Sequence, residues 1–178
     1  MRLGAFPETS ERVRLEKLPA WLGDMKSLKA VSLEEMDHFP ELENASERLP
    51  NVERLWLAGT SRTERLPSWV GKLSKLKQLR LQTCYELKEL PKWMGLLTRL
   101  HTLDLSWCAG LEELPACMGS LTGMQRLNLH GCEGLTELPE WMGSLAVLKT
   151  LDLSECEGLK ELPGRMGSLT GLQTLNLS

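Results

Sequence analysis

The chain has 178 residues, with 21 basic and 24 acidic side chains and a formal net charge of −3 at neutral pH. This mild acidity excludes nucleic acid as the expected partner, because nucleic-acid-binding domains carry a strongly basic surface. No stretch reaches the roughly 20 apolar residues of a membrane-spanning helix, and residues 1–10 lack the apolar run of a signal peptide. We therefore expect a cytoplasmic protein without nucleic-acid or membrane partners.

Residues 1–27 contain one Leu-Pro-Ala-Trp-Leu-Gly motif, at residues 18–23, and we expect an irregular N-terminal cap or partial repeat there. From residue 28 to residue 178, the segment Leu-x-x-Leu-x-Leu, in which Val or Met can replace Leu, recurs every 24 residues. This period predicts a solenoid, because one repeat cannot bury its apolar face and needs neighbours stacked on it. The last repeat stops inside its strand, so we expect it to be truncated, without a C-terminal cap. The seven repeats begin at Leu28, Val52, Leu76, Leu100, Met124, Leu148 and Leu172.

Each repeat has two halves with different patterns. In the first half, leucines alternate with other residues, which is typical of a β-strand with its leucines on one face, and stacked copies form a parallel sheet. The second half reads Leu-Pro-x-x-Φ-Gly, where Φ is apolar. Proline prevents a continuing strand, so we expect a short helical or irregular segment that ends at a left-handed glycine. These halves predict an α/β solenoid, a horseshoe with the parallel sheet on its concave face and the short segments on its convex face.

Four cysteines share one position in consecutive repeats, whereas Cys117 lies in the Leu-Pro half of its repeat. A spacing of 24 residues fits neither the paired framework of a small secreted domain nor the close pairs of a zinc site. We expect buried, reduced thiols that donate to loop carbonyls, and no metal or cofactor. The repeats that begin at Leu28 and Val52 depart most from the pattern, so their connections should be the least regular. The four cysteines are Cys84, Cys108, Cys132 and Cys156.

The complete repeat, L-x-x-L-x-L-x-x-C-x-x-L-x-x-L-P-x-x-Φ-G-x-L, occurs at residues 76–97 and 148–169. It resembles the leucine-rich repeats of plant nucleotide-binding immune receptors, where Cys-x-x-Leu precedes Leu-Pro and Gly-x-Leu. The resemblance implies an intracellular module that recognises a protein ligand and restrains a neighbouring domain. The chain has no G-x-x-x-x-G-K-[ST] loop, so the nucleotide-binding half of such a receptor is absent from it.

The candidate binding residues are those whose side chains the repeat pattern does not require for folding. Trp56 and Trp107 occupy strand-side positions where the sister repeats carry Ser, Arg, Asp, Gly or Glu. Exposed tryptophan and arginine are frequent binding hot spots. A structural alternative is that Arg80 forms a cross-strand ion pair with Asp104 while Trp56 stacks on Arg80. The candidate protein-binding residues are Arg54, Trp56, Arg80, Tyr85, Trp107 and His130.

Two further columns have structural interpretations. Acid and amide alternate at Asp104, Asn128, Asp152 and Asn176, which keeps like charges two strands apart. Tryptophan recurs at the position before Φ, where two sister repeats carry Cys117 and Arg165 instead. Because a polar side chain is accepted there, we expect this column to be at least partly exposed and to pack over the convex surface. The tryptophans of this column are Trp21, Trp69, Trp93 and Trp141.

Nothing in the sequence supports catalysis. His38, His101 and His130 lie in different repeats and columns, and no Ser-His-Asp or Cys-His arrangement follows from them. We therefore expect a non-catalytic module that binds a protein or peptide partner on its concave sheet, resembling the sensor or autoinhibitory region of a plant-type immune receptor. The alternative is an architectural scaffold or regularised repeat array without a ligand. We also expect edge-to-edge self-association through the C-terminal strand at residues 172–178.

Overall fold

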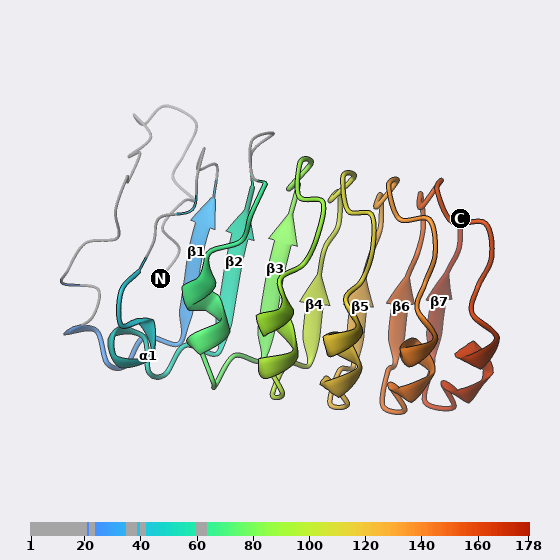
Figure 1. Ribbon diagram of the computed structural model, residues 1–178. Coiled ribbons are helices and arrows are strands. Elements are labelled where there is room, and N and C mark those ends of the chain that lie inside the picture. Colours follow the sequence, from blue (N-terminus) through green and yellow to red (C-terminus); the bar gives the residue numbers. More distant parts are fainter. Residues whose placement is uncertain (1–20, 22–23, 35–38, 40–41, 60–63) are drawn as a thin grey trace.

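The computed structural model describes residue 21, residues 24–34, residue 39, residues 42–59 and residues 64–178. Its strands form one parallel sheet in which the order along the chain is also the order in space (Figure 1). Each residue pairs with the residue 24 positions later, as in the pairing of Trp56 with Arg80. The seven strands are β1 (Ala30–Glu34), β2 (Arg54–Ala58), β3 (Gln78–Gln82), β4 (Thr102–Asp104), β5 (Arg126–Asn128), β6 (Thr150–Asp152) and β7 (Thr174–Asn176).

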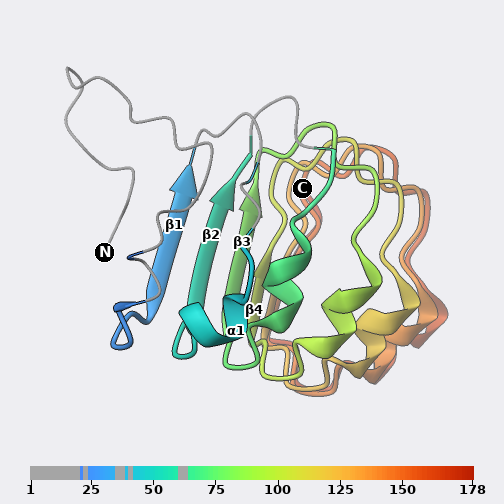
Figure 2. The ribbon, with the colours of Figure 1, turned by 60° about the vertical axis from the view of Figure 1, so that its left-hand side comes forward.

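Short helical turns form the second layer, opposite the sheet (Figures 1 and 2). One short α-helix, α1 (Ala45–Arg48), precedes five 3-10 turns. Each 3-10 turn begins directly after a proline of the Leu-Pro motif, such as Pro67 with φ −67°. Proline fixes φ near this value and has no N–H to satisfy, so it suits the start of a turn. The turns are η2 (Ser68–Lys72), η3 (Lys92–Leu96), η4 (Ala116–Ser120), η5 (Glu140–Ser144) and η6 (Gly164–Ser168).

The core lies between the two layers and consists of stacked, identical positions. The central strand leucines Leu55, Leu79, Leu103, Leu127 and Leu151 are all at most 1% exposed. Burying a leucine side chain contributes roughly 1.5–3 kcal/mol, so each column adds stability to every repeat interface. The predicted solenoid, with its sheet on one face and short helical segments on the other, is confirmed.

The cysteine column is buried, as predicted, and three of its four thiols donate to backbone carbonyls of the preceding repeat. The Sγ atoms of Cys108, Cys132 and Cys156 donate to the carbonyls of Leu81, Leu105 and Leu129 at 3.0, 3.2 and 3.0 Å. Burial raises the pKa of Cys132 to about 12. All five cysteines of the chain are free thiols, and Cys117 is only half-buried.

The predicted left-handed conformation of the glycines in Leu-Pro-x-x-Φ-Gly is wrong. Gly71, Gly95, Gly119 and Gly143 lie inside the 3-10 turns and have no positive φ. A Cβ added to Gly95 would lie 2.7 Å from the carbonyl oxygen of Cys117 in the next turn. These glycines are needed because successive turns approach each other closely, and not because of their φ angle.

The prediction for the convex tryptophans is wrong at one position. Trp69 is 1% exposed, whereas Trp93 and Trp141 are half-buried against the core and Trp21 is 51% exposed. The difference at Trp69 comes from its neighbours, because η2 packs between η3 on one side and the α-helix α1 on the other.

The N-terminal part is less regular than the rest. The connection that begins after β1 contains α1 in place of a 3-10 turn, as its divergent sequence predicted. Most of the predicted cap, residues 1–27, lies outside the described residues, as do residues 60–63 of the next connection. Within the part of the chain that the structure describes, no helix is long and apolar enough to cross a membrane.

Candidate functional site

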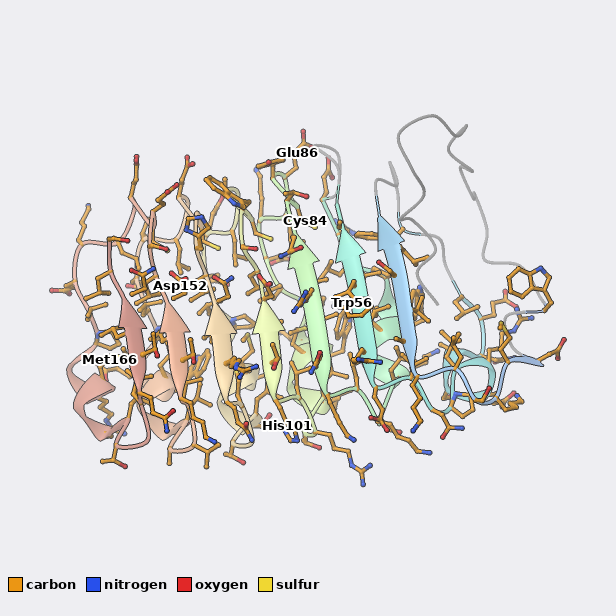
Figure 3. All side chains as sticks on the ribbon, turned by 180° about the vertical axis from the view of Figure 1, so that it is seen from behind. Trp56, Cys84, Glu86, His101, Asp152 and Met166 are labelled. Carbon is orange, nitrogen blue, oxygen red and sulfur yellow. The ribbon has the colours of Figure 1, made fainter. Side chains whose placement is uncertain are left out.

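Three of the candidate residues form one cluster on β2 and β3. The guanidinium carbons of Arg54 and Arg80 lie 5.9 and 5.8 Å from the centre of the Trp56 ring. Arg54 shares a face with Trp56 because it lies two residues earlier in the same strand, and Arg80 pairs directly with Trp56 across the sheet. Figure 3, which views the sheet face, shows Trp56 on β2. We call Arg54, Trp56 and Arg80 the arginine–tryptophan cluster.

The arginine–tryptophan cluster has unused polar groups. Among the described residues, neither guanidinium group makes a hydrogen bond or an ion pair, and the buried indole N–H of Trp56 has no acceptor. The expected stacking of Trp56 with Arg80 is confirmed. No ion pair joins Arg80 to Asp104 in the described structure, where the Asp104 carboxylate instead accepts from Gln82 Nε2 at 3.1 Å and from the Ser106 N–H at 3.1 Å.

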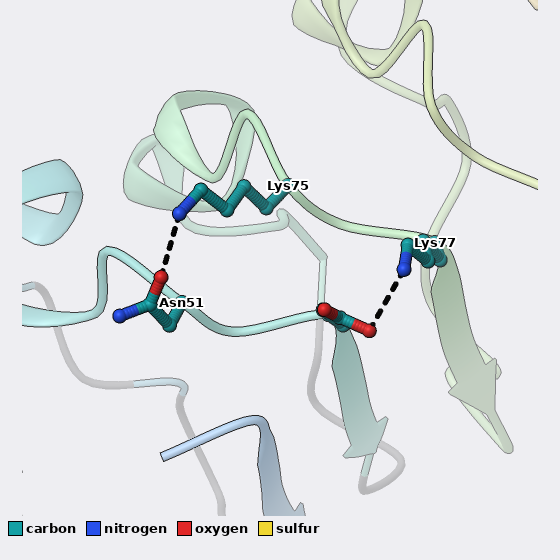
Figure 4. Close-up of polar contacts among 4 residues, drawn as sticks. Asn51, Lys75 and Lys77 are labelled. Carbon is teal, nitrogen blue, oxygen red and sulfur yellow. Dashed lines mark hydrogen bonds and ion pairs between the residues drawn. The ribbon is translucent and has the colours of Figure 1, made fainter. Parts of the chain in front are cut away.

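The edge where the strands begin carries its own polar contacts between repeats (Figure 4). Lys77 Nζ lies 2.9 Å from Glu53 Oε2, and Lys75 Nζ donates to Asn51 Oδ1 at 2.6 Å. The hydrogen bond from Lys77 lowers the pKa of Glu53, so this carboxylate is ionised at neutral pH. Because Lys77 is paired in this way, the positive charge available on β2 and β3 is that of Arg54 and Arg80.

The Asp and Asn column has a structural function that its sequence pattern did not reveal. Oδ1 atoms of Asp104, Asn128 and Asp152 accept the backbone N–H two residues later, at 3.1, 2.9 and 3.0 Å. Short polar side chains compete in this way with the strand ladder and favour turns. Strands β4, β5 and β6 therefore end at this residue and have three residues, whereas β2 and β3, with Trp56 and Arg80 at this position, have five.

Trp107 and His130 form a second contact, just beyond the ends of β4 and β5. Their rings lie 4.7 Å apart at an interplanar angle of 77°, an edge-to-face arrangement. Trp107 has a φ of +62°, and the next residue of its column, Gly131, has a φ of +67°. A Cβ added to Gly131 would lie 2.7 Å from Trp107 Cε3, so the absence of a side chain there makes room for the indole. We call Trp107 and His130 the tryptophan–histidine pair.

Asp152 and Ser154 fix the orientation of His130. Ser154 Oγ donates to Asp152 Oδ1 at 2.5 Å and lies 2.8 Å from His130 Nδ1. Burial raises the pKa of Asp152, but the hydrogen bonds from Ser154 outweigh it and hold this pKa below its usual range. Because the serine proton is used on the carboxylate, Ser154 Oγ accepts from His130 Nδ1–H. In the neutral ring, His130 Nε2 is then a hydrogen-bond acceptor.

Tyr85 is separate from both groups. It is 46% exposed and lies beyond the left-handed Thr83, in the connection that leaves the sheet. There it lines an open groove whose walls include Glu86, Glu89 and Glu113. The structure thus divides the six candidate residues into the arginine–tryptophan cluster, the tryptophan–histidine pair and Tyr85. Among the described residues, no group of three or more His, Cys, Asp or Glu side chains is placed to hold a metal ion.

Comparison with solved structures identifies the fold. The leucine-rich repeat domain of the type III effector XopL superposes with a TM-score of 0.74 and 27% identity, covering 91% of this chain and 57% of that one. The plant peptide hormone receptor RGFR1, solved in complex with RGF2, gives a TM-score of 0.59 and 25% identity, covering 90% and 26%. The Arabidopsis receptor kinase HAESA, in complex with the peptide hormone IDA and the co-receptor SERK1, gives 0.61 and 21%, covering 91% and 32%.

No protein-family model matches the sequence, and no curated protein matches it. The chain spans 57%, 32% and 26% of the solved chains of the XopL repeat domain, HAESA and RGFR1. These structures come from a type III effector and from plant receptors, so they share an architecture and not a single biological role. In its fold, the chain is a leucine-rich-repeat solenoid.

Proposed function

We propose that the chain is a non-catalytic module that binds a protein or peptide partner on its concave sheet. The observation that carries this proposal is the arginine–tryptophan cluster, in which two guanidinium groups flank one indole on β2 and β3 and make no hydrogen bond or ion pair with the described residues. Tryptophan and arginine dominate binding hot spots because they combine large contact area with directional hydrogen bonding. RGFR1, a similar solenoid, was solved in complex with RGF2, and this supports a role in binding a partner.

We further propose that the module is the sensor or autoinhibitory region of a plant-type intracellular immune receptor. The repeat resemblance to those receptors and the ladder of buried, reduced thiols at Cys108, Cys132 and Cys156 support an intracellular location. In this proposal, residues 1–27 form a cap or partial repeat and residues 28–178 form seven repeats. Nucleic acid and lipid are not expected partners, given the chain's net charge of −3.

The test replaces each cluster residue by one that the chain itself uses at the sister position. Arg54→Thr, Trp56→Ser and Arg80→Asn copy Thr102, Ser32 and Asn128. Complexes of the wild-type chain are compared with those of this triple variant by quantitative co-purification from plant cells. We expect specific partners to be lost, and Trp56→Ala alone to reduce partner affinity by about 2 kcal/mol or more.

A convex variant provides the matched control. Trp93→Arg and Trp141→Arg copy Arg165 at the same position of another turn. Partners that depend on the sheet face should remain bound to this variant. If the triple variant keeps every partner of the wild type, the chain is an architectural scaffold and the proposal fails.

A further inference from the structure

The surroundings of the tryptophan–histidine pair are acidic. The residues that follow each strand form two rows, and Trp107 and His130 belong to them. Within the described residues these rows contain no Lys or Arg, and Glu155 is the next charged residue in the row of Trp107. The carboxylates of Asp104 and Asp152 lie in the row just before, at the strand ends. Figure 3 shows Asp152 on β6. Arg80 pairs with Asp104 across β3 and β4. The carboxylates near the pair that have no arginine opposite them are therefore those of Asp152 and Glu155.

We propose that the tryptophan–histidine pair is the subsite for an arginine side chain of the protein partner. This inference rests on the proposed function and names the chemistry of one contact within it. The guanidinium group would stack on the exposed part of the Trp107 ring and donate an N–H to His130 Nε2. The carboxylates of Asp152 and Glu155 would supply the attraction.

Each part of this contact has a counterpart in the structure. Trp107 is 36% exposed, while one side of its ring is turned to Gly131. A cation over an exposed tryptophan face contributes roughly 0.5–1 kcal/mol. His130 Nε2 is an acceptor because Ser154 and Asp152 hold the proton on Nδ1. A planar guanidinium group can stack and donate at the same time, which the ammonium group of lysine cannot do.

A structural role alone does not explain tryptophan at position 107. The left-handed conformation costs an ordinary residue roughly 1–2 kcal/mol, and glycine avoids this cost. Gly131 occupies the next position of the same column in the same conformation, with a φ of +67°. Thr83 and Glu155 hold the same conformation at this position of their repeats, with φ angles of 58° and 55°. The backbone at position 107 therefore requires neither glycine nor tryptophan, and it does not account for the large ring.

The experiment uses the 178-residue chain and a minimal probe. Binding of N-acetyl-arginine N-methylamide is followed by NMR through the indole N–H signals, and the Trp107 signal is assigned from its loss in Trp107→Gly. The citrulline analogue has nearly the same shape but no charge, and the lysine analogue has a charge but no planar group. We expect saturable shifts at Trp107 with the arginine probe and at least about 5-fold weaker binding of the other two.

Two variants use residues that the sister repeats tolerate. Asp152→Asn copies Asn128, which keeps the hydrogen bond to the backbone N–H two residues later at 2.9 Å and removes only the charge. We expect it to weaken probe binding by about 2- to 5-fold, as for an exposed charge pair. Trp107→Gly copies Gly131 and should abolish any saturable shift of the His130 signals. Trp93→Arg, in the turn η3 on the other layer, should leave probe binding unchanged.

Equal binding of the arginine and citrulline probes, or unchanged binding to Asp152→Asn, would overturn the inference. A lysine probe that binds as tightly as the arginine probe would overturn the assignment to arginine. These outcomes are separate from the proposed function, which fails only if the Arg54, Trp56 and Arg80 variant keeps every partner. If that variant loses partners and the probe experiment is negative, the arginine subsite is refuted and the proposed function still stands.

Discussion

The contact between Trp107 and Gly131 predicts a strong coupling between two substitutions. Gly131→Ala adds one methyl group at a residue with a φ of +67°, and this methyl carbon would lie 2.7 Å from Trp107 Cε3 and 3.0 Å from Cδ2. Trp107→Gly removes the ring that the methyl group would meet. The pair of substitutions therefore separates the cost of the left-handed backbone from the cost of the steric contact.

The magnitudes follow from the two causes. The left-handed conformation costs alanine roughly 1–2 kcal/mol relative to glycine. Forcing a methyl group into a close contact costs a further roughly 1–3 kcal/mol, because the indole must move. We expect Gly131→Ala to lower the free energy of unfolding by about 2–5 kcal/mol in the wild-type chain. In the Trp107→Gly background, the expected loss is only about 1–2 kcal/mol.

Urea unfolding of the four proteins in this cycle, followed by circular dichroism, measures the coupling. Equal denaturant slopes must be verified, because repeat proteins can lose cooperativity. In thermal unfolding, each kcal/mol corresponds to a shift of about 2–4 °C for a chain of this size. If Gly131→Ala costs the same in both backgrounds, the indole does not lie against Gly131, and the reasoning about the tryptophan–histidine pair is refuted.

Four further predictions concern other parts of the solenoid. In the native chain at pH 8, a thiol reagent should label the half-buried Cys117 first, while Cys108, Cys132 and Cys156 react only on denaturation. Rapid labelling of these three buried cysteines in the native chain would contradict their burial. Because burial raises the pKa of Cys132 from 9.0 to about 12, the folded chain holds this proton more tightly than the unfolded chain, so the free energy of unfolding should fall as pH rises from 9.0 towards 12. A flat stability profile over that range would contradict this linkage. Trp56→Phe removes an indole N–H without an acceptor, so the free energy of unfolding should change by less than about 1 kcal/mol, whereas a loss above about 2 kcal/mol would indicate a bonded N–H. The 178-residue chain should self-associate through β7, where Leu175 and Leu177 are 42% and 57% exposed, and a sedimentation experiment that finds only monomer at high concentration would refute this.

The fold could be predicted from the sequence because a single period specifies it. The leucine positions determine which face of each strand is buried, and a constant spacing of 24 residues requires the same register in every strand pair. The cysteine column could be predicted for the same reason. Trp69 is an exception, because its burial depends on α1, which interrupts the period.

The details of the candidate site could not be predicted, because the same residue type meets different physical needs. Glycine serves a left-handed φ at Gly131 and a close approach between turns at Gly95, and a sequence pattern does not distinguish the two. Asp104 and Asp152 were interpreted only through their charge, although their oxygens also accept backbone N–H groups. Tyr85 was grouped with the sheet residues, but the left-handed Thr83 turns the chain away before it.

The two tryptophan sites differ from the rest of the solenoid in how they relate to stability. Residues that serve stacking recur along the chain, as the leucine and cysteine columns do. Trp56 and Trp107 each occur once in their columns, so the stacking of repeats does not account for either residue. The sites also differ in charge, since arginines flank Trp56 and carboxylates lie near Trp107. A partner that engages both sites would therefore be held in one orientation, because reversing it would bring like charges together.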